Sequence, residues 1–191
     1  MKKLLGIVVL GLLLNTNAYA VNLPKDVASG NKYFKSLSKK YKKYGMQVVD
    51  KKEGHPVRAG QKSIRFEVRP GDCGYNDDWS DCDTDRERHE LSGKRMSGGE
   101  WWYAWSIFLP KDFVNVSPTK VALGQFHQDK GHVVWMFQNQ NFSVPGGYWV
   151  DNQVPGFTKT INKVLTNDEM IGKWNDILVN VKWSKKEDGF F

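Results

Sequence analysis

The chain has 191 residues, of which 40% are hydrophobic and 13% aromatic, and its formal net charge at pH 7 is +7. This composition excludes an intrinsically disordered protein, because such a chain can bury a substantial apolar core. The length suits one domain rather than two, and the abundant aromatic and β-branched residues favour strands.

Residues 1–20 have the pattern of a secretory signal peptide. Two lysines form a basic start, residues 4–14 form an apolar run, and Ala18-Tyr19-Ala20 supplies the small residues of a cleavage site. The apolar run is shorter than the roughly 20 residues that a membrane-spanning helix needs. We therefore expect a secreted or periplasmic protein without a membrane span after cleavage; an uncleaved anchor is the alternative.

Positive charge is concentrated in the next segment. Residues 25–53 contain nine lysines against three acidic residues, and the rest of the mature chain is nearly neutral. The charge therefore does not predict nucleic-acid binding by the whole domain. A lysine-rich face is either solvated or attracted to an anionic polymer. We assign residues 21–52 to a basic N-terminal segment and residues 53–191 to the main domain.

The basic segment contains one amphipathic pattern, in residues 31–44. Its apolar side chains recur at spacings of three and four, and Gly45 follows the last of them. Such spacing predicts a short helix that ends at the glycine. The positions that carry the pattern are Tyr33, Phe34, Leu37, Tyr41 and Tyr44.

Beyond this segment the chain consists of short runs rich in aromatic and β-branched residues, separated by turn residues. Several runs alternate between apolar and polar side chains, which is typical of strands with one buried and one solvated face. The pattern predicts an all-β fold, a two-sheet antiparallel β-sandwich of jelly-roll type, with a closed barrel as the alternative. The predicted strands are residues 47–50, 63–69, 86–91, 100–109, 121–128, 133–138, 148–152 and 174–183. The run at 100–110 is apolar on both faces and is expected to lie in the core.

The chain has two cysteines, Cys73 and Cys82. In a chain that enters an oxidising compartment they predict a disulfide that closes a loop. The acidic residues at 72–85 offer oxygen ligands for calcium, but they lack the spacing of an EF-hand. We interpret this segment as a solvated loop and expect no metal site and no cofactor requirement.

The first candidate site segment is residues 86–91. As a strand it places Arg86, Arg88 and Glu90 on one face. A carboxylate two residues from an arginine can hold its guanidinium in a fixed orientation, which leaves other N–H donors for a ligand carboxylate. The alternative is an exposed ladder of ion pairs, which contributes little stability.

The second candidate site segment is residues 121–127, in which Gln125 and His127 share one face of a strand. An amide donor beside a group that titrates near neutrality is suited to removing a proton from a carbon next to a carboxylate. The alternative is a polar strand face in which His127 has only a structural hydrogen bond.

Two further strands carry aromatic side chains that could contact a sugar. Trp149 shares a face with Asp151, and Trp135 shares a face with Phe137. Exposed indoles stack on sugar rings, so we include Trp149, Asp151 and Trp135 among the candidate binding residues. Burial in the sandwich core is the alternative for each tryptophan.

Several stretches in this order resemble one known group of enzymes. Together they are similar to the concanavalin-like jelly-roll polysaccharide lyases, nearest to the heparin lyase I and glucuronan lyase group, with a more distant likeness to jelly-roll alginate lyases. The stretches, which span most of residues 64–191, are Arg88-His89-Glu90-Leu91, Trp102-Tyr103-Ala104-Trp105-Ser106-Ile107-Phe108-Leu109-Pro110, Gln125-Phe126-His127, Trp174-Asn175-Asp176 and Val181-Lys182-Trp183-Ser184.

The resemblance implies a secreted lyase that cleaves a uronic-acid-containing polysaccharide by β-elimination. It implies that Arg88 and Gln125 bind the uronate carboxylate, that Glu90 orients Arg88, and that His127 is the base or its partner. The expected partner is an anionic polysaccharide, and we expect the chain to act as a monomer.

The chain departs from the family pattern near its C-terminus. The family's tyrosine lies in a segment similar to Tyr-Phe-Lys-x-Gly, which this sequence lacks. We therefore expect a C-terminally incomplete domain, with Tyr103 and Tyr148 as substitutes for that tyrosine. A non-catalytic glycan-binding jelly roll is the alternative function. A jelly-roll glycoside hydrolase is a more distant one, because its paired carboxylates in a Glu-x-Asp-x-x-Glu strand are absent.

Overall fold

The chain divides into two units, Met1–Met96 and Ser97–Phe191, and each is described by itself. Within the part of the chain that is described, no helix is long and apolar enough to cross a membrane. The predicted signal segment lies outside that part, except that its last residue opens the first strand. The computed structural model describes residues 20–21, 23, 33–37, 39–93, 95–96, 98–114, 116–128, 131–139, 146–154, 156 and 158–191.

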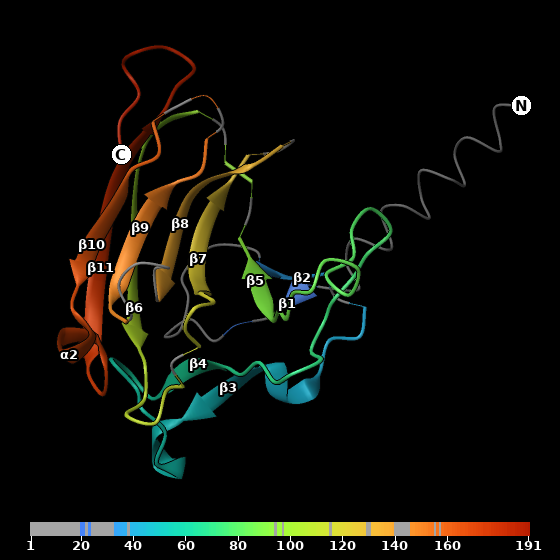
Figure 1. Cartoon of the computed structure of the whole chain (residues 1–191). Helices are drawn as coiled ribbons and strands as arrows, with labels where there is room; N and C mark the ends of the chain where they lie inside the picture. The colour runs from blue at the N-terminus through green and yellow to red at the C-terminus, as the bar shows by residue number, and fades with distance from the viewer. Residues whose placement is uncertain are drawn as a thin grey trace, which may run out of the picture. The chain divides into compact units, whose positions relative to one another are not determined.

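The second unit is built from two antiparallel sheets (Figure 1). Four strands that follow one another in sequence form a meander in the order β10-β9-β8-β7, and the first and last strands of the unit pair as β11-β6. The elements are β6 (Gly99–Phe108), β7 (Val121–His127), β8 (Val133–Asn139), β9 (Tyr148–Asn152), β10 (Ile161–Leu165), α2 (Asn167–Met170) and β11 (Trp174–Trp183).

The core of this unit lies between the two sheets. Side chains from β6 and β11 pack against those of β7, β8 and β9, and Tyr148 is fully buried among them. The Trp105 ring meets the Phe137 ring edge-on, with centroids 5.0 Å apart. Its indole N–H donates to the Tyr148 hydroxyl at 3.3 Å, so the buried polar atoms of the aromatic layer are paired. The prediction of a two-sheet antiparallel β-sandwich is confirmed.

Strand β6 differs from its prediction. Its side chains alternate in burial, with Trp101, Tyr103, Trp105 and Ile107 packed against the core. Trp102 points the other way and is 63% exposed. The expectation that both faces of this run are buried is wrong, because β6 lies in an outer layer with only one sheet face covered.

The first unit is also made of short antiparallel strands, in the orders β1-β2-β5 and β3-β4. Strand β3 begins directly after a single 3-10 turn, and its partner β4 follows a second such turn. The elements are β1 (Ala20–Val21), β2 (Tyr33–Ser36), η1 (Lys43–Gly45), β3 (Met46–Asp50), η2 (Lys51–Glu53), β4 (Lys62–Phe66) and β5 (Glu90–Ser92).

The helix predicted over residues 31–44 is wrong. Strand β2 pairs with β5 through this segment, with Phe34 opposite Ser92. Leu37 and Lys40 then adopt φ values of 47° and 61°, which no right-handed helix tolerates. The tyrosines that carry this spacing instead surround a histidine: Tyr41 and Tyr44 both pack edge-on against the ring of His89.

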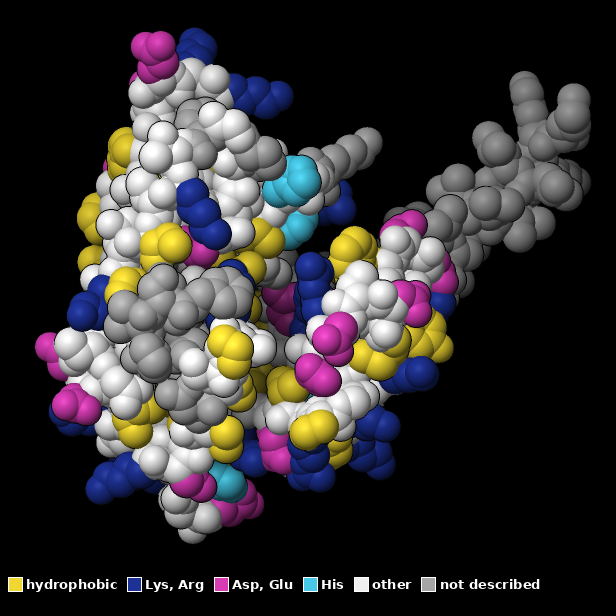
Figure 2. All heavy atoms as spheres, in the orientation of Figure 1, with side chains coloured by type: hydrophobic (Ala, Val, Ile, Leu, Met, Phe, Trp, Pro, Cys, Tyr) yellow, Lys and Arg dark blue, Asp and Glu magenta, His cyan; other side chains and the backbone are white. Residues whose placement is uncertain are grey.

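The basic character of this segment remains visible in the first unit. Lys40, Lys42, Lys43, Lys51 and Lys52 are all exposed. Figure 2 shows Lys and Arg side chains gathered on the visible face around η1. Both alternatives for this surface, solvation and attraction to an anionic polymer, therefore stay open.

Candidate functional site

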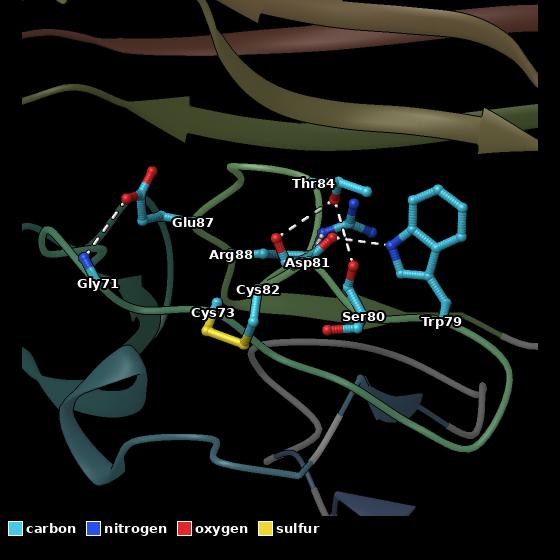
Figure 3. Close-up of a disulfide and its surroundings, with 9 residues drawn as sticks. All are labelled: Gly71, Cys73, Trp79, Ser80, Asp81, Cys82, Thr84, Glu87 and Arg88. Carbon is cyan, nitrogen blue, oxygen red and sulfur yellow. Dashed lines mark hydrogen bonds and ion pairs between the residues drawn. A yellow bond between two sulfur atoms is a disulfide. The ribbon is translucent and has the colours of Figure 1, made fainter.

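In the first unit, Arg88 lies between two carboxylates, of which Figure 3 shows that of Asp81. Its Nε pairs with Oδ2 of Asp81 at 3.0 Å, and its Nη1 donates to Oε2 of Glu90 at 3.1 Å. The predicted orientation of Arg88 by Glu90 is therefore present. Sequence reasoning missed Asp81, which comes from the loop closed by the disulfide.

The strand predicted over residues 86–91 is shorter in the structure, because β5 begins only at Glu90. The backbone N–H groups before it bond to the loop instead: Arg86 donates to Asp81 and Arg88 to Asp72. Arg86 therefore does not join the predicted face. Its guanidinium lies over the ring of Trp79, 5.4 Å from the centroid.

The predicted disulfide between Cys73 and Cys82 is present, with the two Cα atoms 5.0 Å apart. The interpretation of residues 72–85 as a solvated loop is only partly right. Asp77, Asp78 and Asp83 are exposed. Asp72 and Asp81, which directly precede the two cysteines, are only 4% and 0% exposed, because each accepts hydrogen bonds inside the unit.

Asp72 belongs to a buried network around His89. It accepts from the Tyr44 hydroxyl at 2.6 Å and from the Arg69 amide at 2.8 Å. Burial alone would raise the pKa of Asp72, but these hydrogen bonds and the nearby positive charges outweigh it and lower the pKa. His89 bonds to the Glu67 carbonyl through Nδ1 at 2.8 Å, and its Nε2 accepts from the Lys42 amide at 3.3 Å. His89 therefore has a structural role in this network.

Glu67 gives this unit a pH-dependent contribution to stability. Hydrogen bonds from Arg69 and Arg65 lower the pKa of Glu67 below its ordinary value. The contribution of Glu67 to stability is complete at a pH above the ordinary pKa of glutamate. It is lost as the pH falls through the lowered pKa of the folded protein. The melting temperature of the protein should therefore exceed that of Glu67→Gln at about pH 6, and the gap should close toward about pH 3. A gap that stays constant across this range would contradict the assignment.

In the second unit, two of the candidate residues, Gln125 and Asp151, lie on the sheet face opposite the core. Gln125, Met136 and Asp151 form one cross-strand row over β7, β8 and β9. Phe126 and Phe137, their neighbours in sequence, point into the core. Gln125 lies on this outer face, as predicted, and its side chain is half-buried.

His127 is exposed at the end of β7. Its Nδ1 lies 2.6 Å from the carbonyl oxygen of Gln128. A carbonyl can only accept, so in the neutral imidazole Nδ1 carries the proton and Nε2 keeps its lone pair. This hydrogen bond thus leaves Nε2 as the ring nitrogen that can accept a proton.

Trp149 and Asp151 share the outer face, as predicted, but neither forms an open surface. They are 9% and 1% exposed. The Trp149 indole donates to the Gly146 carbonyl at 2.7 Å, and Asp151 accepts from Gln153. Burial raises the pKa of Asp151, although the Lys120 ammonium 4.0 Å away offsets part of the effect. The Trp149 indole is thus buried, which is one of the two alternatives that the sequence left open, and its role in binding a sugar stays a prediction.

Three other aromatic candidates lie toward the core. Trp135 shares that face with Phe137, as predicted, and stacks on Phe191 with ring centroids 4.1 Å apart. Tyr148 is fully buried, and burial raises the pKa of its hydroxyl. The Tyr103 hydroxyl accepts from the Trp183 indole at 3.0 Å. None of the three faces the side of the sheet that carries Gln125, which argues against Tyr103 and Tyr148 as substitutes for the missing tyrosine.

The structure thus places the candidate residues in two groups. Arg88 and Glu90 belong to the first unit, and Gln125, His127 and Asp151 belong to the second. Across the described residues, no group of three or more His, Cys, Asp or Glu side chains is arranged to hold a metal ion.

The fold and these groups define an antiparallel β-sandwich protein in which one sheet carries Gln125 on its outer face and an exposed histidine, His127, at the end of the same strand. The family model described as polysaccharide lyase matches residues 29–191, so the chain belongs to the polysaccharide lyase family. This confirms the resemblance at the level of the family, while the nearer likeness to heparin lyase I and glucuronan lyase stays a prediction. No curated protein and no solved structure matches the chain.

Proposed function

We propose that this protein is an exported lyase that cleaves a uronic-acid-containing polysaccharide by β-elimination. The family match over residues 29–191 carries the proposal. A lyase breaks a glycosidic C–O bond without water, so a proton must leave the carbon next to the one that bears the leaving oxygen. That proton becomes acidic enough when the carbon also bears a carboxylate whose developing charge is stabilised by fixed donors. The chemistry therefore favours a uronate.

His127 is the proposed base. Its Nε2 takes the proton from C5 of the uronate, and the electron pair of that C–H bond forms a double bond between C4 and C5. The bond from C4 to the leaving oxygen then breaks, and this oxygen takes up one proton from the solvent, to which His127 afterwards releases the proton that it removed. The products are an unsaturated uronate end and an ordinary sugar hydroxyl. The hydrogen bond from Nδ1 to the Gln128 carbonyl supports this role.

Gln125 and Arg88 are the proposed partners of the uronate carboxylate. An amide N–H and a guanidinium can each donate to a carboxylate oxygen, and they stabilise it most as negative charge develops in the transition state. The clamped guanidinium supports the role of Arg88, since the carboxylates leave it little freedom. The assignment of both residues to one substrate rests on the family resemblance.

Export is part of the proposal. The first 20 residues have the sequence pattern of a signal peptide. The Cys73–Cys82 disulfide is compatible with an extracellular or periplasmic protein, because disulfides persist in oxidising compartments.

An absorbance assay on a panel of polysaccharides tests the proposed function. The panel holds glucuronan, alginate and a heparin-like polymer, with a neutral glucan as the control. The expected result is ultraviolet absorbance from unsaturated ends on at least one polyuronate and none on the glucan. Binding of the protein to an immobilised polyuronate, without any rise in absorbance, would instead indicate the non-catalytic glycan-binding function. New reducing ends without absorbance would indicate hydrolysis.

A further inference from the structure

The loop closed by the disulfide contains the same dipeptide twice, as Asp72-Cys73 and Asp81-Cys82. Both aspartates are buried, and the disulfide joins the residues that directly follow them. Their side chains approach two consecutive residues: Asp81 pairs with Arg88, and Asp72 lies 3.7 Å from Nδ1 of His89. The covalent bridge therefore fixes the two carboxylates that flank the start of β5.

We propose that Asp81 is a positioning residue that fixes the Arg88 guanidinium for substrate binding, and that the disulfide keeps Asp81 in place. This inference rests on the proposed function of Arg88 as a partner of the uronate carboxylate. The sequence resemblance gave Glu90 alone this orienting role, and Asp81 carried no assignment.

Asp81 has little freedom of its own. Its Oδ1 accepts from the Trp79 indole at 3.0 Å, and its Oδ2 forms an ion pair with Nε of Arg88 at 3.0 Å without a hydrogen bond. Its backbone N–H donates to the Gly74 carbonyl, and its carbonyl accepts from the amides of Thr84 and Arg86. A fully buried carboxylate that is fixed by its backbone and by a hydrogen bond at one oxygen sets the position of the cation with which it pairs.

The two carboxylates leave one side of the guanidinium open. Asp81 occupies Nε and Glu90 occupies Nη1, whereas no described residue hydrogen-bonds to Nη2. The Arg88 side chain is 28% exposed, so a ligand can reach it. The two carboxylates offset the positive charge of Arg88. Arg88 therefore acts on a uronate through directed donors rather than through an excess of positive charge.

The first test compares the kinetics of four variants on the polyuronate that the panel identifies. Asp81→Asn should lower kcat/KM by about 100-fold, because a displacement of roughly 1 Å of a binding group costs that much. Asp83→Asn, an exposed aspartate of the same loop, is the matched control and should match the wild type. In an Arg88→Ala background the Asp81→Asn change should have no further effect, because a positioning residue acts only through the residue that it positions.

The second test does not depend on activity. In a ¹⁵N-labelled protein, the Arg88 Nε–H bond, whose resonance is assigned by its loss in Arg88→Lys, should have the high NMR order parameter of a rigid group. The order parameter should fall in Asp81→Asn and after reduction of the disulfide, and it should stay high in Asp83→Asn. Trp79→Phe, which releases only Oδ1 of Asp81, should give an intermediate order parameter and serves if Asp81→Asn fails to fold.

The two tests separate the positioning role from the proposed function. A high order parameter that Asp81→Asn or Trp79→Phe lowers, in a protein that forms no unsaturated product, would reject the lyase function and keep the positioning role. An unchanged order parameter in both variants, or an equal loss of kcat/KM when Arg88 is already alanine, would overturn the positioning role itself.

Discussion

Replacing His127 with alanine is expected to lower the rate of unsaturated-product formation by about 10²–10⁴-fold, the usual contribution of a positioned general base. The reason lies in the hydrogen bond from Nδ1 to the Gln128 carbonyl, which leaves Nε2 as the basic nitrogen on an exposed ring. Alanine removes that base but no core contact, so the melting temperature should change little. The measurement is the initial rate of absorbance increase on the polyuronate that gives the strongest signal.

His55→Ala is the matched control, because His55 is a half-buried histidine of a loop in the first unit that carries no assigned role. It should retain the wild-type rate. His127→Gln adds a second comparison, since glutamine keeps hydrogen-bonding capacity at this position but cannot take up the proton. Wild-type activity in His127→Ala would remove the central assignment of the proposed mechanism.

The strands were predictable where one face meets the core. Toward the end of residues 174–183, the apolar Val179, Val181 and Trp183 alternate with polar side chains, and β11 has the predicted bounds. Strand β10 escaped prediction because it pairs on only one side and its side chains are mostly exposed, so no apolar alternation marks it. The short helix α2 did carry a signal, a capping box in which Thr166 and Glu169 cap each other's backbone.

The candidate site was predictable only as far as neighbours in sequence determine it. Gln125 lies on the outer face because strand alternation places it there, and Glu90 reaches Arg88 from two residues away. Asp81 reaches Arg88 through a loop whose path depends on the disulfide and on backbone bonds, so no periodicity reveals the contact. The indole of Trp149 is buried because it bonds to the backbone at Gly146, a local turn that composition does not encode.

The second large effect concerns stability. Gly45 ends η1 and is buried against the ring of His89. A Cβ added at this position would lie 2.3 Å from Cγ and Cδ2 of that ring, a separation that requires something to move. The His89 side chain is only 2% exposed, and both of its ring nitrogens are hydrogen-bonded. The ring therefore cannot yield without giving up a hydrogen bond in the interior.

Gly45→Ala is expected to lower the free energy of unfolding by about 3 kcal/mol, the upper end of the usual cost of overpacking a core. Urea denaturation measures this change, with Gly93→Ala as the control, because a Cβ there comes no closer than 4.0 Å to Tyr33. Adding Gly45→Ala to His89→Ala should cost much less than adding it to the wild type, since the ring that causes the clash is gone. Equal costs in the two backgrounds would show that His89 does not set the requirement for glycine at position 45.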